Sequence, residues 1–127
     1  MSFFVYKNKP FTRFARKAGI VDADLWRAAR LALEGVVDAD LGGGVIKQRI
    51  ARRGEGKSGG SRAIVLFTRG KRAVFVYGFE KKDQANISRA ELEAFRELAK
   101  VVLGYTELEM TSFVEKGVFS PIEPRED

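Results

Sequence analysis

The residues of this chain best suited to chemistry are basic side chains concentrated in one segment. Residues 47–72 contain nine lysines and arginines and one acidic residue, so the segment carries a net charge of +8, whereas the rest of the 127-residue chain carries −2. Solubility does not require such clustering, which is typical of a surface that binds a polyanion. Lys47 and Arg49 stand two residues apart in a β-prone run, so in a strand they lie side by side on one face.

The chain has no histidine and no cysteine, and this limits its chemistry. Ser-His and Cys-His nucleophilic mechanisms and thiolate metal sites are excluded. Lysine, arginine, tyrosine or carboxylate groups could still promote attack of an RNA 2′-OH on the adjacent phosphorus, which needs a base, cations around the phosphorane and an acid for the leaving 5′-oxygen. A lysine among other cations is a natural candidate for the base, because neighbouring positive charge favours its neutral form. The residues by themselves leave open whether the basic segment cuts RNA or only binds it.

Composition places the chain among small globular proteins. Hydrophobic residues make up 45% of it, which is enough for one folded domain. No apolar run approaches the about 18 residues of a membrane span, and the first residues form neither a secretory signal nor a transit peptide. We therefore expect a cytoplasmic protein.

The first half of the chain predicts a strand followed by two helices. Residues 2–6 are apolar and β-prone. Residues 10–18 begin with a proline and carry apolar residues at helical spacing, and residues 22–36 repeat this spacing with Asp22 as the candidate N-cap. Residues 38–44 end in three glycines and predict a loop or bulge, because the Lys-Ser/Thr pair that completes a P-loop is missing.

The second half predicts a meander of three strands and two further helices. The strands span residues 45–53, 62–68 and 73–79, joined by a glycine-rich hairpin loop and a short turn. Capping boxes at Ser88 and Thr106, each with a glutamate three residues later, predict the starts of the helices.

These elements predict an α+β fold. Their order is β-α-α-β-β-β-α with an extra C-terminal helix, so that two N-terminal helices pack on a mostly antiparallel sheet. We expect a single domain over residues 1–117 and an extended C-terminal tail over residues 118–127.

The meander can bring several cations to one end of the sheet. Arg62 begins a strand, Lys57 lies in the loop before it, and Lys81 and Lys82 follow the last strand. Convergent cations are what binding of an RNA backbone requires. Tyr77 in the last strand can serve either the core or the site. We expect the other basic residues of the segment to be solvated strand-edge charges or general RNA contacts, namely Arg52, Arg53, Lys71 and Arg72.

Two runs of the sequence resemble the RelE/HigB toxins of type II toxin–antitoxin systems, within the RelE/ParE superfamily. The first is GGVIKQRIARRGEGKSGGSR at residues 43–62, with the glycine-flanked K-x-G-G-x-R element of the HigB-like branch. The second is YGFEKKDQANIS at residues 77–88. The likeness extends over about residues 2–117 and implies a RelE-like fold, which has the element order predicted above.

The resemblance implies a metal-independent endoribonuclease that needs no cofactor. Such an mRNA interferase cleaves mRNA at the ribosome by 2′-OH transesterification and so inhibits translation. Its partners are mRNA, the ribosome and a cognate antitoxin, which in this branch is usually a helix-turn-helix protein of the HigA type. The toxin meets operator DNA only through that antitoxin, and no membrane is involved.

Residue by residue, the resemblance assigns catalytic roles to four cations. Lys47 and Arg49 match paired basic residues, one of which is the base or a phosphate ligand. Arg62 matches the arginine at the scissile phosphate, and Lys81 matches a residue that assists the leaving group or the phosphate. RelE has a tyrosine for proton transfer where this chain has Ile87, so the acid and the base stay unassigned. The expected RNA contacts are Lys57, Arg52, Arg53, Lys82 and Tyr77.

Two other functions are open at this point. A toxin of the same fold can poison DNA gyrase, as in the ParE branch, although those members generally lack the basic set found here. A non-catalytic RNA- or DNA-binding protein would also account for the charge of residues 47–72.

Overall fold

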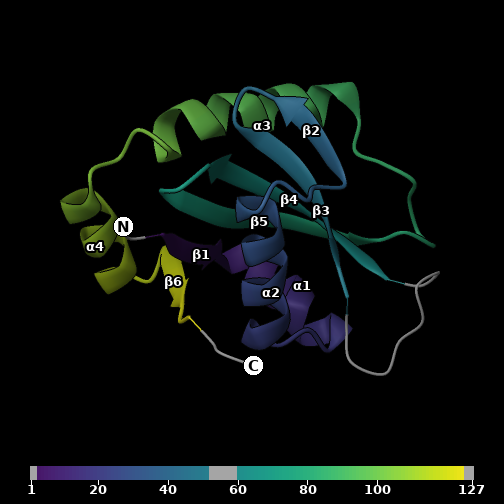
Figure 1. Ribbon diagram of the computed structural model, residues 1–127, viewed down its shortest axis with the longest axis horizontal. Coiled ribbons are helices and arrows are strands. Elements are labelled where there is room, and N and C mark those ends of the chain that lie inside the picture. Colours follow the sequence, from purple (N-terminus) through teal and green to yellow (C-terminus); the bar gives the residue numbers. More distant parts are fainter. Residues whose placement is uncertain (1–2, 52–59, 125–127) are drawn as a thin grey trace.

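The computed structural model describes residues 3–51 and 60–124 and shows an α+β fold, as expected (Figure 1). One six-stranded sheet with the strand order β2-β3-β4-β5-β1-β6 is covered by helices on both faces. The elements follow in the order β1 (Phe4–Asn8), α1 (Lys9–Ala18), α2 (Asp22–Leu33), β2 (Ala39–Gly42), β3 (Val45–Ile50), β4 (Ser61–Thr68), β5 (Arg72–Glu80), α3 (Arg89–Val102), α4 (Glu107–Glu115) and β6 (Phe119–Ile122).

The sheet is antiparallel except between β5 and β1, which run parallel. A parallel pair needs a long connection between its strands. Here the connection from β1 to β5 includes the α1–α2 hairpin and strands β2, β3 and β4. The strand that opens the chain therefore ends beside the last strand of the meander.

Each face of the sheet has its own apolar core. Helices α1 and α2 cover one face, where Phe11 and Leu25 pack against Ile46, Val65 and Phe75. Helices α3 and α4 cover the other face, with a cluster formed by Tyr6, Val45, Ile64, Leu66, Val74, Val76, Phe79, Ala99, Val102 and Met110. The predicted packing of the α1–α2 hairpin on the sheet is confirmed.

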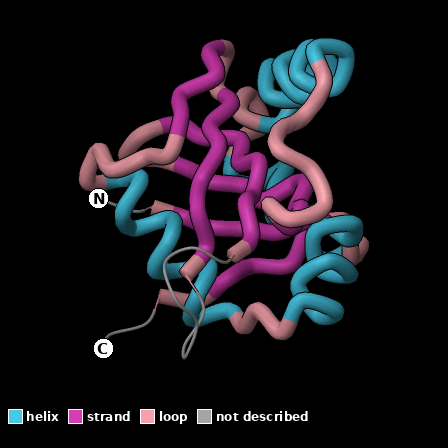
Figure 2. The backbone as a smooth tube through the Cα atoms, turned by 90° about the vertical axis from the view of Figure 1, so that its right-hand side faces the viewer, coloured by secondary structure: helices cyan, strands magenta, loops and turns pink. Residues whose placement is uncertain are grey.

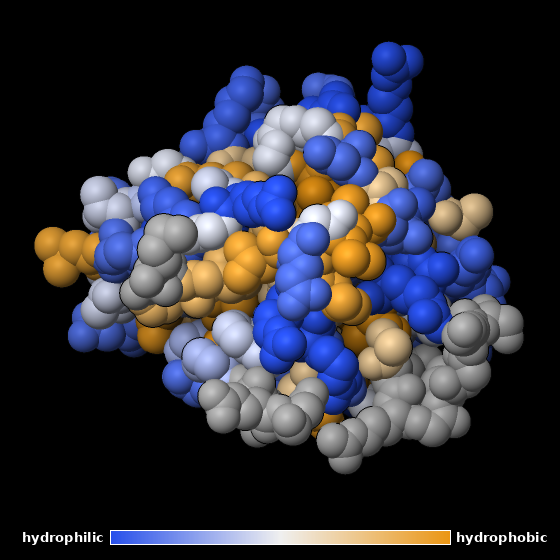
Figure 3. Space-filling model, viewed as in Figure 1, coloured by the Kyte–Doolittle hydropathy of each residue, from blue (hydrophilic) through white to orange (hydrophobic). Residues whose placement is uncertain are grey.

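The outward side of α2 forms a polar stripe with apolar surface on both sides of it (Figure 3).

Close contact between α1 and β5 depends on one glycine. A Cβ atom at Gly78 would lie 2.2 Å from a ring carbon of Phe14, closer than side chains approach. The phenyl ring of Phe14 therefore rests directly on the backbone of β5, and its neighbour Phe11 packs on Phe75 with ring centroids 5.2 Å apart.

The predicted loop at residues 38–44 contains an additional short strand. Strand β2 pairs antiparallel with β3, with a register shift between Asp40 and Gly42. Gly42, Gly43 and Gly44 all have positive φ angles, 81°, 64° and 83°, which side chains disfavour. Helix α3 packs on this turn, because Arg96 donates a hydrogen bond to the carbonyl of Leu41. The glycines thus reverse the chain tightly into β3.

Residues 119–122, within the segment that the sequence analysis assigned to a tail, form the edge strand β6. They pair antiparallel with β1, and Phe119 and Ile122 are buried. The local signal for this strand is weak, because it is four residues long and contains a proline.

The helix caps follow the predictions at two of three sites. Ser88 and Glu91 exchange hydrogen bonds of 3.1 and 2.8 Å, and Thr106 forms the same box with its glutamate. Asp22 is wrong as the N-cap of α2, because it is the first helical residue and its carboxylate pairs with Lys7 Nζ at 2.6 Å. The carboxylate of Asp24 accepts the Val21 N–H instead.

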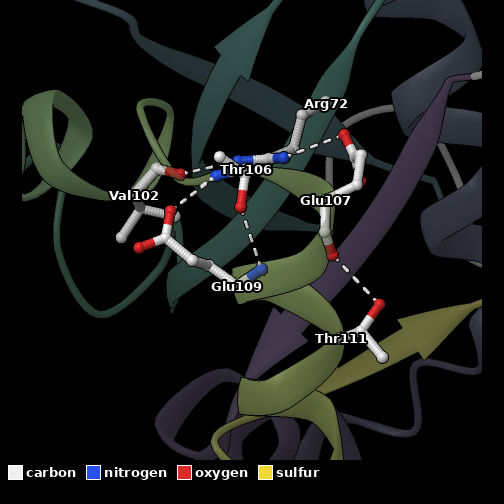
Figure 4. Close-up of polar contacts among 6 residues, drawn as sticks. All are labelled: Arg72, Val102, Thr106, Glu107, Glu109 and Thr111. Carbon is white, nitrogen blue, oxygen red and sulfur yellow. Dashed lines mark hydrogen bonds and ion pairs between the residues drawn. The ribbon is translucent and has the colours of Figure 1, made fainter.

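Arg72 is fully buried, so its assignment as a solvated charge is wrong. Its guanidinium donates to the carbonyl of Val102, the last residue of α3, at 2.8 Å and to Glu107 Oε2, in the first turn of α4, at 2.9 Å (Figure 4). Arg72 shares the sheet face of Val74, and α3 and α4 meet over this face. The side chain therefore fixes one helix against the other.

Candidate functional site

The register of the meander brings three predicted cations onto one sheet face. Arg49 in β3 lies directly opposite Arg62 in β4, and Lys47 is two residues from Arg49 on the same face. In the next pair of strands, Arg62 of β4 lies opposite Phe79 of β5, and Ile64 lies opposite Tyr77. Three cationic side chains gathered on one sheet face form a surface suited to binding an anion.

Helix α3 packs on this face over β5. The three cations, on β3 and β4, lie beside the area that the helix covers. The ring of Tyr77 packs on Phe95 of α3, with centroids 5.7 Å apart. The side chains of Lys47 and Arg62 are 17% and 12% exposed. Cations that are largely enclosed interact more strongly with a bound anion than cations in open water.

Asp38, which the sequence analysis did not identify, lies between two of these cations. Its Oδ2 atom is 3.5 Å from Arg62 Nε and 3.7 Å from Lys47 Nζ. The residue stands directly before β2, and the sequence predicted no strand there, so no local signal placed it beside β3. The site thus contains a carboxylate as well as cations.

A buried glutamine holds the backbone around Asp38. Gln48 of β3 is 3% exposed and points to the α2 side of the sheet. Its Oε1 accepts the N–H of Asp38 at 3.0 Å, and its Nε2 donates to the carbonyls of Ala28 and Val36 at 3.0 and 2.8 Å. A buried amide is costly unless its groups are hydrogen-bonded. Here it ties the segment before β2 to both β3 and α2.

A cleft of about 300 Å³ opens between α2 and β3 beside Asp38. Its floor is apolar, and charged side chains stand around it. The lining residues are Asp24, Arg27, Ala28, Leu31, Val36, Val37, Asp38, Gln48, Arg49 and Ala51. Asp38 and Arg49 therefore border this cleft as well as the cation site.

The turn after β5 lies beside the start of β4. The N–H of Lys81 donates to the carbonyl of Gly60 at 3.2 Å. Figure 2 shows this side of the molecule, with the strands of the sheet in magenta and the loops in pink. Gly60 has a φ of 130°, which side chains disfavour, and a Cβ atom there would be in ordinary van der Waals contact with Arg62 Nη1 and Arg49 Nε, at 3.8 and 4.0 Å. The segment before β4 therefore passes close to both guanidinium groups. Lys81 and Lys82 are exposed at this end.

Tyr77 and Ile87 line the α3 side of this region. The hydroxyl of Tyr77 donates to Gln84 Oε1 at 3.2 Å, which ties the strand to the loop that carries Lys81. Ile87 packs against the core under α3. Neither residue contacts the cations in a described interaction. The predicted RNA contacts Arg52, Arg53 and Lys57 lie outside the described residues.

Within residues 3–51 and 60–124, no three histidine, cysteine or carboxylate side chains gather in a way that could hold a metal ion. In the same residues, no helix is both long enough and apolar enough to cross a membrane.

A comparison with models of known protein families gives a match over most of the chain. A family model described as "RelE toxin of RelE / RelB toxin-antitoxin system" matches residues 3–122, nearly the whole chain. The comparison with curated proteins found no match.

Proposed function

The chain belongs to the RelE toxin family of RelE/RelB toxin–antitoxin systems, and from this premise we propose that it is an endoribonuclease that cleaves mRNA on the ribosome. Family membership implies a cognate antitoxin. The observation that supports cleavage best is the convergence of Lys47, Arg49 and Arg62 on one face of the meander.

The proposed reaction is transesterification of an RNA phosphodiester. Arg62 and Lys47 bind the non-bridging oxygens of the scissile phosphate, and Arg49 adds a second guanidinium opposite Arg62. The 2′-oxygen attacks phosphorus and the bond from phosphorus to the 5′-oxygen breaks, which leaves a 2′,3′-cyclic phosphate and a 5′-OH. The fixed cations stabilise the negative charge that grows on the phosphorane.

The remaining cations extend the proposed RNA surface. Lys81, at the end of β5, assists the leaving group, and Lys82 beside it contacts the RNA backbone. We also propose contacts to the RNA backbone from Arg52, Arg53 and Lys57, because these residues belong to the same basic segment of the sequence. We keep Tyr77 as a candidate RNA contact at the rim, because its hydroxyl lies at the loop of Lys81.

The proposed setting is that of the HigB-like branch. The toxin acts in the cytoplasm on ribosome-bound mRNA. A helix-turn-helix antitoxin of the HigA type neutralises it, and the complex meets operator DNA through the antitoxin. The glycine-flanked K-x-G-G-x-R element at residues 57–62 supports this branch.

The test is in vitro translation of a reporter mRNA with the purified protein, followed by primer extension to map 5′ ends. We expect ribosome-dependent cuts that Arg62→Ala reduces roughly 10²–10³-fold, as loss of one transition-state donor does. Arg13→Ala, which removes an exposed arginine of α1, serves as the charge-matched control and keeps wild-type activity.

Two results would redirect the function. Intact mRNA together with blocked DNA supercoiling would indicate a gyrase inhibitor. Intact mRNA together with salt-sensitive RNA binding would indicate a non-catalytic binder.

A further inference from the structure

The carboxylate of Asp38 lies within 4 Å of two of the clustered cations, Lys47 and Arg62. A carboxylate opposes the binding of phosphate, so its place in a cationic site calls for an explanation. Its distances of 3.5 and 3.7 Å to Arg62 Nε and Lys47 Nζ exceed the about 2.7–2.9 Å of a charge-assisted hydrogen bond. The carboxylate therefore lies beside the cations without a close hydrogen bond to either.

We propose that Asp38 is the general base of the cleavage reaction, which accepts the proton of the 2′-OH while Arg62 and Lys47 hold the phosphate. This assignment rests on the endoribonuclease function proposed above. It adds to that function the identity of the group that starts the reaction.

Hydrogen-bonding capacity and access favour Asp38 over the lysines. A carboxylate oxygen is an acceptor, whereas a lysine ammonium carries three donors and no acceptor. The Asp38 side chain is 32% exposed and its carboxylate lies 3.5 Å from Arg62 Nε, so a substrate group beside a phosphate bound there can reach it. The charged groups that face it are Lys47 and Arg62 from the sheet and, along the cleft, Arg49 of β3 with Asp24 and Arg27 of α2.

The fold holds the backbone of Asp38 in place before substrate binds. The backbone N–H of Asp38 is fixed by the side chain of Gln48, whose amide also bonds the carbonyls of Val36 and Ala28. A base that is already oriented does not need to be ordered at the moment of reaction. A buried, fully hydrogen-bonded glutamine in a β-strand is well suited to this positioning role.

The strand order places base and acid on opposite sides of the phosphate site. Across the sheet, Asp38 precedes β2, Arg62 lies on β4 and Lys81 follows β5. In the proposed step the 2′-OH proton passes to Asp38, the 2′-oxygen bonds to phosphorus, and the bond to the 5′-oxygen breaks. The ammonium of Lys81 protonates the leaving 5′-oxygen, and exchange with water then restores both side chains. The reaction changes no oxidation state, so it needs no oxidant or reductant.

The test compares Asp38→Asn with Asp40→Asn in single-turnover cleavage on programmed ribosomes at saturating enzyme. Asp40 is a matched control because it stands two residues away and its carboxylate accepts the N–H of Gly42 at 2.9 Å at the end of β2, away from the cations. We expect Asp38→Asn to cleave roughly 10²–10⁴-fold more slowly, the usual contribution of a general base. Its affinity for a substrate with a 2′-deoxy group at the cut should be equal to or tighter than that of wild type, because a negative charge has been removed from an anion site.

A conservative variant gives a second readout. Asp38→Glu keeps a carboxylate at this position and should recover part of the cleavage rate that Asp38→Asn loses. Circular dichroism and thermal melting of each variant verify folding.

Three outcomes would overturn the assignment. Wild-type cleavage by folded Asp38→Asn would leave the nuclease function standing and remove Asp38 as the base. A variant with weakened binding of the 2′-deoxy substrate but a normal rate at saturation would make Asp38 a positioning residue for Arg62. If the wild-type protein does not cut RNA at all, the proposed function fails and the base assignment fails with it.

Discussion

Replacing Glu107 by alanine should cost more stability than removing its buried partner Arg72. In Glu107→Ala the guanidinium of Arg72 stays fully buried with the carbonyl of Val102 as its one described partner. Breaking a fully buried pair in this way costs about 3–5 kcal/mol. Because the Glu107 side chain is 50% exposed, water can replace part of the lost interaction, and we expect about 2–3 kcal/mol. For a chain of this size that corresponds to a fall in Tm of roughly 10 °C.

Arg72→Met provides the contrasting perturbation. It fills most of the same volume, removes the buried charge and leaves Glu107 free to face water, so the main loss is the hydrogen bond to Val102. We expect about 1 kcal/mol. Chemical denaturation with urea, with fluorescence of Trp26 as the probe, measures both variants. If Arg72→Met is the more destabilised of the two, the reasoning that the uncompensated guanidinium dominates is refuted.

Three further predictions concern pH, packing and RNA binding. Burial, reinforced by the charge of Glu107, raises the pKa of Tyr6 above its ordinary value of 10.0, so the unfolded chain loses this proton first. Stability should therefore decline as pH rises above about 10, and Tyr6→Phe should decline less in urea titrations between pH 8 and 11. Gly78→Ala forces a Cβ atom against the ring of Phe14 and should cost about 1–3 kcal/mol in thermal melting; an unchanged Tm would show that α1 shifts freely. Arg49→Gln should lower the slope of log K against log salt for RNA binding by about 1 in fluorescence anisotropy, and an unchanged slope would remove Arg49 from the phosphate contacts.

Much of the fold could be predicted from the sequence, because its signals are local. Apolar residues at helical spacing identified α1 and α2, and the capping boxes at Ser88 and Thr106 marked the starts of α3 and α4. Alternation in residues 45–50 placed Lys47 and Arg49 on one face. Each of these patterns depends on neighbours within a few residues, and local sterics and hydrogen bonds decide the outcome.

The elements that were missed depend on pairing with distant segments. Strand β2 is short, lies beside three glycines and is defined by its partner β3. Strand β6 is defined by β1, more than a hundred residues earlier in the chain. Edge strands of four residues carry little propensity of their own, since the neighbouring strand supplies most of their stabilisation.

The sequence by itself determined the charge, the residue types available for chemistry and the order of the main elements. The tertiary structure decided which charges meet and which are enclosed. Arg49 faces Arg62 because of the register between β3 and β4, and Arg72 is buried because α3 and α4 meet over the start of β5. Asp38 reaches Lys47 and Arg62 because Gln48, from another strand, holds its backbone. The physical reason is that ion pairing and burial depend on distances in space, which a linear pattern does not contain.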